Sequence, residues 1–254
     1  MKARPTDLEA IDSSLLSIQD EFREHFGWGL AADLESAHAL RAAIEESNVD
    51  IWSRAQRART VAALHRRLVL RATDIALLGA AVTTAEIETA LTDNTLLIAA
   101  DGATGVLSTL PDSLAERAWS RLACVVSDAD GWPHLQSAVE REVPIALHAH
   151  GDNRAQVEAT LMRWSEENPP PIFLTHQTTS DLEGIYNPGG FTDGDRAICL
   201  LLSMGVSPER LILVGYDEHT LGRWSGVTDE PIKRRKLGWM AKILDHMGYG
   251  DGGQ

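Results

Sequence analysis

Cysteine, lysine and long apolar runs are all scarce in this chain of 254 residues. The two cysteines, Cys124 and Cys199, lie in apolar segments, which is typical of reduced cysteines in a core and not of a disulfide framework. No apolar stretch reaches the length that a membrane-spanning helix needs, and no stretch resembles a signal peptide. We therefore expect a soluble, globular, cytoplasmic protein without disulfides.

Positive charge is also in short supply. The formal net charge of -14 at pH 7 repels phosphate backbones and anionic lipid, so we expect neither nucleic acid nor membranes as partners. No phosphate-binding loop of the form G-x-x-x-x-G-K-[ST] occurs, and a phosphate ligand would therefore need a metal ion. The one dense basic cluster is Lys233 to Lys236, which could pair with phosphate groups or form a solvated turn of a helix. The sequence also leaves open whether the protein forms a homo-oligomer.

Hydrophobic periodicity divides the chain into parts. From Thr6 to about Leu70 the apolar residues recur at helical spacing, so residues 1–70 are predicted to form an N-terminal helical region. Beyond it, apolar runs spaced by roughly 20 to 40 residues are typical of βαβ units. Residues 71–247 are therefore predicted to form an α/β domain with a mostly parallel, Rossmann-like sheet flanked by helices, and residues 248–254 a flexible tail. The predicted strands are 75–81, 96–100, 122–126, 145–147, 172–174 and 211–214.

Polar side chains directly follow most of these apolar runs. The carboxyl ends of parallel strands meet at one edge of a sheet, which is where open α/β sheets bind ligands. We therefore expect a binding site at this edge. The polar strand ends are Asp101-Gly102, Asp128 to Asp130, His148 to Asn153, Thr175 to Thr178 and Gly215 to Glu218.

Asp128 and Asp130 point to a metal site. They stand two residues apart at the end of an apolar run, so along a strand they would share a face, and carboxylate oxygens are the ligands that Mg²⁺ prefers. Asp152 is the expected third ligand, although it could instead cap the helix predicted from Ala155. A polar turn without metal is the simpler alternative. The pair His148 and His150 would suit zinc, but the carboxylates at the other strand ends favour a hard cation.

The segment from Tyr186 to Arg196 combines three glycines, two carboxylates and an arginine before a predicted helix from Ala197 to Met204. Glycines let a backbone approach a ligand closely, and amides at a helix N-terminus favour an anion. We interpret this segment as a binding loop, with a surface loop capped by an aspartate as the alternative.

These motifs resemble a known family, the archaeal-type 6-hydroxymethyl-7,8-dihydropterin pyrophosphokinases, which are related in fold to thiamin pyrophosphokinase. The resemblance covers nearly the whole chain, but a glycine-rich turn usual after the first strand is replaced here by Leu78 to Thr84. It implies transfer of diphosphate from ATP to the pterin hydroxymethyl group with Mg²⁺, on a route to folate or methanopterin-type carriers. The residues that carry it are 100–103, 127–131, 148–153, Thr178 and 189–197, with 25–28 and 233–244 similar as well.

The resemblance also implies roles for individual residues. Mg²⁺ would be held by Asp128, Asp130 and Asp152, which with Asp193 form the expected catalytic group. The expected nucleotide-binding residues are Asp101, Gly102, Thr175, Gln177 and Arg196. The expected pterin-binding residues are His150, Asn153, Asn187, Gly190, Phe191, Thr192 and Asp195.

Three other functions remain open from the sequence. A nucleotide-sugar glycosyltransferase would use the Asp128-Ala129-Asp130 motif in the same way. A zinc-dependent hydrolase would use His148 and His150, and a nucleotide sensor would bind without turnover.

Overall fold

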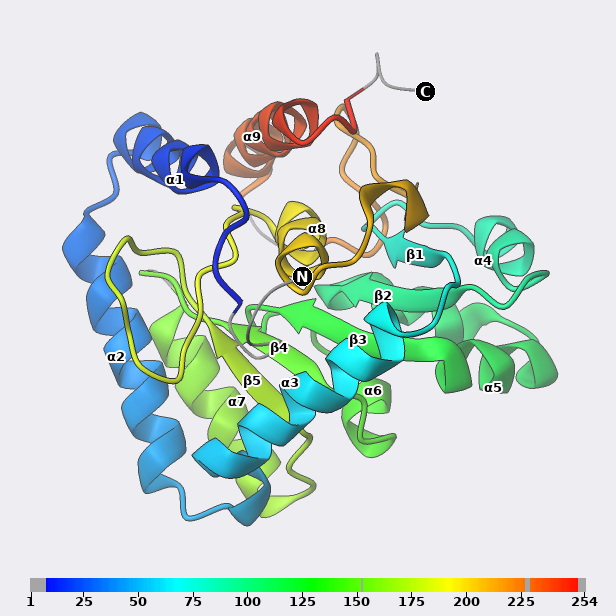
Figure 1. The fold of residues 1–254 in the computed structure, drawn as a ribbon, viewed down its shortest axis with the longest axis horizontal. Coiled ribbons are helices and arrows are strands. Elements are labelled where there is room, and N and C mark those ends of the chain that lie inside the picture. Colours follow the sequence, from blue (N-terminus) through cyan, green and yellow to red (C-terminus); the bar gives the residue numbers. More distant parts are fainter. Residues whose placement is uncertain (1–7, 152, 227–228, 251–254) are drawn as a thin grey trace.

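Six parallel strands form one sheet at the centre of the computed structural model, which describes residues 8–151, 153–226 and 229–250 (Figure 1). The strand order is β5-β4-β3-β2-β1-β6, and every neighbouring pair is parallel. The predicted α/β class is therefore confirmed. The strands are β1 (Ile75–Leu78), β2 (Leu96–Ala100), β3 (Leu122–Ser127), β4 (Ile145–His148), β5 (Ile172–Thr175) and β6 (Leu211–Val214).

The first strand is shorter than its apolar run. β1 ends at Leu78, where the prediction extended it to Ala81. The chain stays beside β6 after this point, because the Gly79 N–H donates to the Val214 carbonyl at 2.8 Å and the Ala81 N–H to the Gly215 carbonyl at 3.0 Å. Residues 79–81 therefore form a turn at the edge of the sheet where the ligand site is expected.

The opening of the chain is helical, as the periodicity predicts. Asp12 caps the first helix through a hydrogen bond from the Ser14 N–H, and Gly27 ends it in the left-handed conformation that favours glycine. The sequence Gly27-Trp28-Gly29 is thus a turn between two helices. These elements are α1 (Ser13–Phe26), α2 (Leu30–Glu46), the 3₁₀ helix η1 (Asp50–Trp52) and α3 (Arg54–Val69).

Helices also follow the strands. The basic cluster Lys233 to Lys236 lies inside the last helix, which begins at Glu230. The remaining helices are α4 (Thr84–Ala90), η2 (Asp101–Thr109), α5 (Asp112–Arg121), α6 (Gln136–Glu140), α7 (Arg154–Glu166), α8 (Asp193–Ser203), η3 (Pro208–Arg210) and α9 (Glu230–His246).

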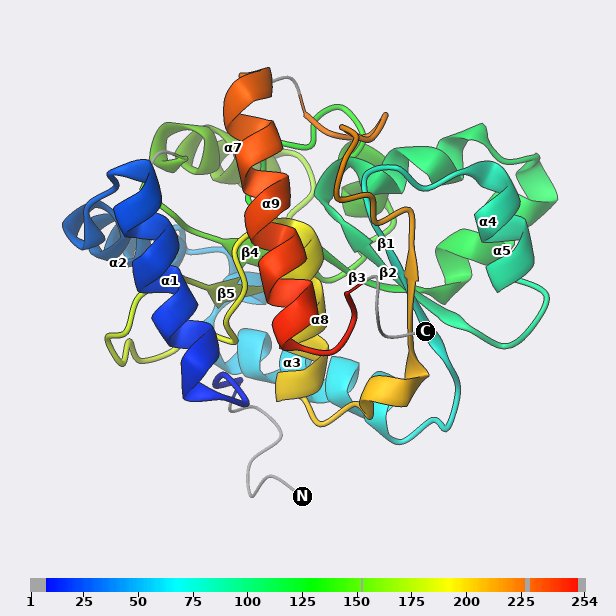
Figure 2. The ribbon, with the colours of Figure 1, turned by 90° about the horizontal axis from the view of Figure 1, so that it is seen from above.

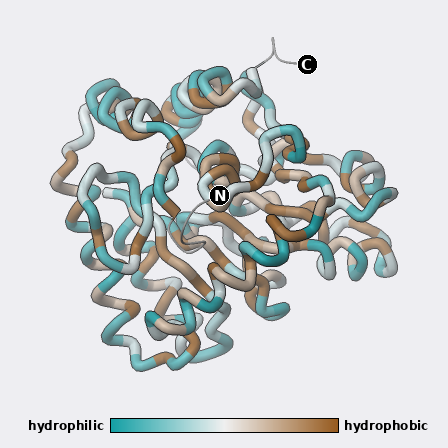
Figure 3. Tube along the Cα trace, in the orientation of Figure 1, coloured by the Kyte–Doolittle hydropathy of each residue, from teal (hydrophilic) through white to brown (hydrophobic). Residues whose placement is uncertain are grey.

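Both faces of strands β1 to β5 are buried, whereas the edge strand β6 exposes Ile212. Alternate strand residues enter two hydrophobic clusters, as Ala76 and Leu78 join one and Ile75 and Leu77 the other. The first cluster includes side chains of α2 and of α4 to α7, and the second includes side chains of α3, α8 and α9. The central strands accordingly appear apolar in Figure 3. Burial on both faces explains why the strands read as continuous apolar runs in the sequence.

A further layer of helices lies outside α8. Figure 2 shows α9 alongside α8 and α1 next to α9, although α1 and α9 come from opposite ends of the chain. A third cluster joins Phe22 of α1, Phe191, Cys199 of α8 and Ile243 of α9. Among the described residues, no helix has the length and apolar character to cross a membrane.

Candidate active site

A cavity of about 340 Å³ opens at the carboxyl ends of the strands. The segments after all six strands contribute to its lining, so the expectation that the polar strand ends share one edge is confirmed. The start of α8 and one face of α9 complete the wall. One lining residue from each strand end, in the order β1 to β6, is Gly79, Asp101, Asp128, His150, Gln177 and Tyr216.

Asp101 follows β2 and is held firmly in place. Its backbone adopts φ 44°, in the left-handed region that is uncommon for residues other than glycine. Its Oδ1 accepts hydrogen bonds from the Ser127 hydroxyl at 2.5 Å and from the Gly131 N–H at 3.2 Å. A β-carbon at Gly131 would overlap the Asp101 carboxylate, so this close approach requires glycine there.

Asp128 and Asp130 are brought together by a turn. The strand ends at Ser127, and Ala129 has φ 72°, so the alternation of side chains along a strand is not what aligns the two carboxylates. The turn is closed by the Asp130 N–H, which donates to Asp128 Oδ1 at 3.3 Å, and by the Ala129 N–H, which donates to the Ser127 hydroxyl at 2.9 Å. The predicted shared face exists, but its cause is a left-handed residue.

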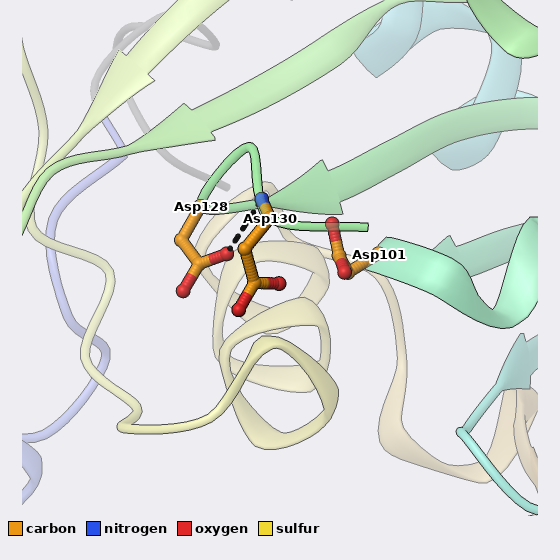
Figure 4. Close-up of side chains that lie close together, drawn as sticks. All are labelled: Asp101, Asp128 and Asp130. Carbon is orange, nitrogen blue, oxygen red and sulfur yellow. Dashed lines mark hydrogen bonds between the residues drawn. The ribbon is translucent and has the colours of Figure 1, made fainter. Parts of the chain in front are cut away.

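The three carboxylates of Asp101, Asp128 and Asp130 form a cluster, with ligand atoms within 4.8 Å of one another (Figure 4). Burial, and then the charges of Asp128 and Asp130, raises the pKa of Asp101 well above its usual value. Burial and the charge of Asp128 also raise the pKa of Asp130. A bound cation would relieve this repulsion. Three converging hard oxygen ligands fit a divalent cation such as Mg²⁺.

Asp128 differs from its two neighbours. Burial acts to raise its pKa, but the hydrogen bond and charge of His150 outweigh burial and bring the pKa below its usual range. His150 Nε2 lies 3.1 Å from Asp128 Oδ2. Asp128 is thus the carboxylate of the cluster most readily ionised.

Asp193, at the start of α8, lines the same cavity but lies outside the three-carboxylate cluster. Burial, and then the charges of Asp128 and Asp101, raises its pKa well above the usual value. The expected third ligand Asp152 lies outside the residues that the structure describes. Asp101, for which the family resemblance implies nucleotide binding, is the third member of the cluster.

Asn153 does not line the cavity, but its side chain forms hydrogen bonds to the backbone of residues that do. Its side-chain amide donates to the carbonyls of Asp128 and His148, each at 3.1 Å, and its Oδ1 accepts the His150 N–H at 3.1 Å. Asn153 therefore connects the turn after β3 to the end of β4.

Gln177 is the best-anchored polar side chain at the β5 end. Its Nε2 donates to both oxygens of Asp33 at 3.1 and 3.0 Å, and its Oε1 accepts from Arg196 Nη2 at 3.3 Å. Thr175 and Arg196 are buried behind the cavity wall and do not line it. Of the expected nucleotide-binding residues, only Asp101, Gly102 and Gln177 line the cavity.

Some residues of the glycine-rich loop before α8 line the cavity, and others hold the loop in place. Phe191 and Thr192 line the cavity, whereas Asn187, Gly190 and Asp195 do not. The Asp195 carboxylate caps α8, accepting from the Phe191 N–H at 2.5 Å and from the Thr192 hydroxyl at 2.9 Å. Asn187 is bonded to Gln19 on α1 through both ends of its amide. This loop is therefore packed against α1 and largely buried.

Several lining residues were not among the catalytic, metal-binding, nucleotide-binding or pterin-binding residues expected from the sequence. Trp28 lies in the turn between α1 and α2 and stacks on Phe26, with ring centroids 4.5 Å apart. Tyr216, Asp217 and Thr220 follow β6, and the polar strand end there was the signal that could have identified them. Lys233 and Lys236 come from α9.

Comparison with known proteins agrees with the family resemblance. A curated protein of Pyrococcus furiosus named 6-hydroxymethyl-7,8-dihydropterin pyrophosphokinase is 36% identical over 132 residues, which is 50% of this chain and 48% of that protein. A protein of the same name from Methanothermobacter thermautotrophicus is 31% identical over 170 residues, 61% of this chain and 64% of that protein. The chain is similar to archaeal pterin pyrophosphokinases.

The similarity to these pyrophosphokinases is partial in length. The matched stretches span about half of one relative and less than two thirds of the other. No protein-family model matches the chain. The resemblance to pterin pyrophosphokinases that the motifs suggest is nevertheless confirmed by two separate proteins.

Proposed function

We propose that this protein transfers diphosphate from ATP to 6-hydroxymethyl-7,8-dihydropterin. The pterin hydroxyl oxygen forms a bond to the β-phosphorus of ATP, the bond from that phosphorus to the α,β-bridging oxygen breaks, and AMP leaves while the hydroxyl proton is released. The observation that carries the proposal is the cluster of Asp101, Asp128 and Asp130 in a cavity of a chain similar to two named pyrophosphokinases.

The cavity suits this chemistry because transfer to an alcohol depends on positioning and charge neutralisation more than on a covalent intermediate. Asp101, Asp128 and Asp130 would hold Mg²⁺, whose role when bound is to neutralise and polarise the phosphates. Asp152 stays a predicted ligand that lies outside the described residues. The proposed location is the cytoplasm.

Trp28, Phe191 and the fixed amide of Gln177 are suited to an aromatic heterocycle. The two rings provide an apolar wall, with centroids 6.1 Å apart, and the Gln177 amide provides a polar edge. We assign the pterin to this side of the cavity. The nucleotide would then occupy the side formed by the turns after β1 and β6, where Gly79 to Ala81, Gly215 and Gly222 are small lining residues.

No observation favours the zinc hydrolase or the glycosyltransferase. Nδ1 of His148 lies 3.1 Å from the Thr175 hydroxyl and Nε2 lies 3.4 Å from Gln177 Oε1, so the ring is engaged within the protein. Burial, and then the charge of Arg196, lowers the pKa of His148 well below its usual value, which keeps the ring neutral. These are properties of a core histidine.

Phosphorus NMR tests the reaction directly. We expect incubation with ATP, Mg²⁺ and 6-hydroxymethyl-7,8-dihydropterin to yield AMP in step with pterin diphosphate, and a chelator to stop it. Stoichiometric ADP, or no consumption of ATP with this acceptor, would refute the proposal.

Substitution of the cluster tests the assignment of its residues. Asp128→Asn and Asp130→Asn keep side-chain size but remove a charged ligand, so we expect turnover to fall by about 100-fold or more, with an unchanged circular dichroism spectrum. Asp93→Asn is the matched control, because Asp93 is exposed and precedes β2, at the opposite edge of the sheet. Substantial activity in either cluster variant at saturating Mg²⁺ would contradict the assignment.

A further inference from the structure

Two lysines on one face of α9 line the cavity. Lys233 and Lys236 are three residues apart, so they project from the same side of the helix. The arginines between them have other partners, as Arg234 pairs with Glu230 and Arg235 lies 4.5 Å from the centroid of the Phe26 ring. Lysine is rare in this chain, and half of its lysines are at this cavity: the full set is Lys2, Lys233, Lys236 and Lys242.

Among the described residues, the direct contacts of both ammonium groups are with uncharged groups. Lys233 Nζ donates to the Gly226 carbonyl at 2.5 Å. Lys236 Nζ lies 5.6 Å from the centroid of the Trp28 ring and 5.8 Å from that of Phe191. These contacts orient the two side chains without neutralising their charge.

The lysines and the carboxylates act on one another across the cavity. Burial lowers the pKa of Lys233, and the negative charge of Asp130 partly offsets that effect. The charge of Lys236 in turn contributes to the low pKa of Asp128. The cavity therefore has an acidic side, formed by the strand ends, and a second side, formed by α9, that carries both lysines next to the N-cap residue Asp229.

A phosphate chain bound here needs more positive charge than one divalent cation supplies. When ionised, the carboxylates of Asp101, Asp128 and Asp130 would together more than compensate the two positive charges of such a cation. Among the described residues that line the cavity, Lys233 and Lys236 are the only lysines or arginines. A polyanion bound in the cavity would contact the metal on the strand-end side and the two ammonium groups on the α9 side.

We propose that Lys233 and Lys236 form a phosphate subsite that binds a linear di- or triphosphate from the α9 side. This proposal adds a phosphate-binding role to the proposed function. It rests on that function only where it takes the bound phosphate chain to be that of ATP. The subsite takes the place of the lysine of a phosphate-binding loop, which this sequence lacks. It also gives α9 a direct role in substrate binding.

Calorimetric titration with inorganic tripolyphosphate at saturating Mg²⁺ tests the subsite. We expect Lys233→Met and Lys236→Met each to weaken binding by about 10- to 100-fold, as for the loss of one charged hydrogen bond. Arg234→Met removes the same charge from the same helix turn, but its side chain is exposed and paired with Glu230. We expect this control to bind within about 3-fold of the wild type, because the effect of an exposed charge is screened.

Titration with Mg²⁺ alone separates a phosphate role from a general loss of structure. Removing a positive charge near the carboxylates leaves Mg²⁺ affinity unchanged or raises it, whereas a disturbed cavity would lower it. Unchanged tripolyphosphate binding in both lysine variants, an equal loss in Arg234→Met, or weaker Mg²⁺ binding in the lysine variants would overturn the proposal. Because these titrations contain no pterin, they give an answer even if the pterin is not the acceptor.

Discussion

Asp33 connects the N-terminal helices to the candidate active site, and its substitution is expected to have a large effect. Asp33 lies on α2 with 4% of its surface exposed. Its carboxylate accepts from Arg23 Nη1 at 3.2 Å and from the Gly151 N–H at 2.8 Å, and both of its oxygens accept from Gln177 Nε2. One carboxylate thus joins α1 and α2 to the ends of β4 and β5.

The substitution Asp33→Asn keeps the shape of the side chain but replaces an acceptor by a donor. The new amide would face the donors of Arg23 or Gln177, and Arg23 would be left in the interior with Asp20, whose side chain is 63% exposed, as its remaining carboxylate partner. Removing one member of a buried ion pair costs about 3 to 5 kcal/mol. For a domain of this size that corresponds to a fall of about 6 to 20 °C in Tm.

Asp20→Asn is the matched control, because it removes the other partner of the same arginine. Asp20 lies 2.6 Å from Arg23 Nη2 but on the surface, so the expected loss is about 0 to 1 kcal/mol. Urea unfolding followed by circular dichroism gives both free energies. If the two variants differ by less than about 1 kcal/mol, the buried network does not stabilise the fold as we infer.

Two further predictions concern the cluster and the buried histidines. Gly131→Ala places a methyl group against the Asp101 carboxylate, so we expect weaker Mg²⁺ binding in calorimetric titration, whereas Gly238→Ala in the open middle of α9 should leave it unchanged. His176 accepts the Thr178 N–H through Nδ1 at 3.1 Å, and burial, followed by the charge of Arg196, lowers its pKa to about 4. As the pH falls, His176 binds a proton in the unfolded chain before it does so in the folded protein. The contribution of His176 to the free energy of unfolding therefore falls by about 3 kcal/mol from pH 7 to pH 4, and His176→Asn should reduce this pH dependence. An unchanged pH profile of the unfolding free energy would show that His176 is not buried in its neutral form.

The strands and their polar ends could be predicted from the sequence. A parallel strand buried on both faces must be apolar at consecutive positions, and five of the six strands match their apolar runs to within one residue at each end. Asp101, Asp128 and Gln177 could be placed at one edge for the same reason, because parallel strands end on the same side. These inferences need only local sequence and the direction of the chain.

The arrangement of the carboxylates at that edge of the sheet could be seen only in the tertiary structure. The sequence did not reveal that Ala129 would adopt φ 72° and so align Asp128 with Asp130, nor that Asp101 would join them. Left-handed residues other than glycine are stabilised by their surroundings, and here the Ser127 hydroxyl donates to Asp101 Oδ1 and accepts from the Ala129 N–H. A local pattern carries no signal for such a constraint.

The sequence by itself determined the fold class, the position of the site and its acidic character, since these follow from which residues are apolar and where the apolar runs stop. Only the tertiary structure decided which distant residues enclose the cavity. Trp28, from a turn between two N-terminal helices, and Lys236, from the last helix, lie over the same strand ends, with the lysine 5.6 Å from the centroid of the indole ring. Trp28 and Lys236 come close because α1 and α9 pack together through Phe22, Phe191 and Ile243. Hydrophobic periodicity shows that each helix has a buried face, but it does not show which helix packs against which.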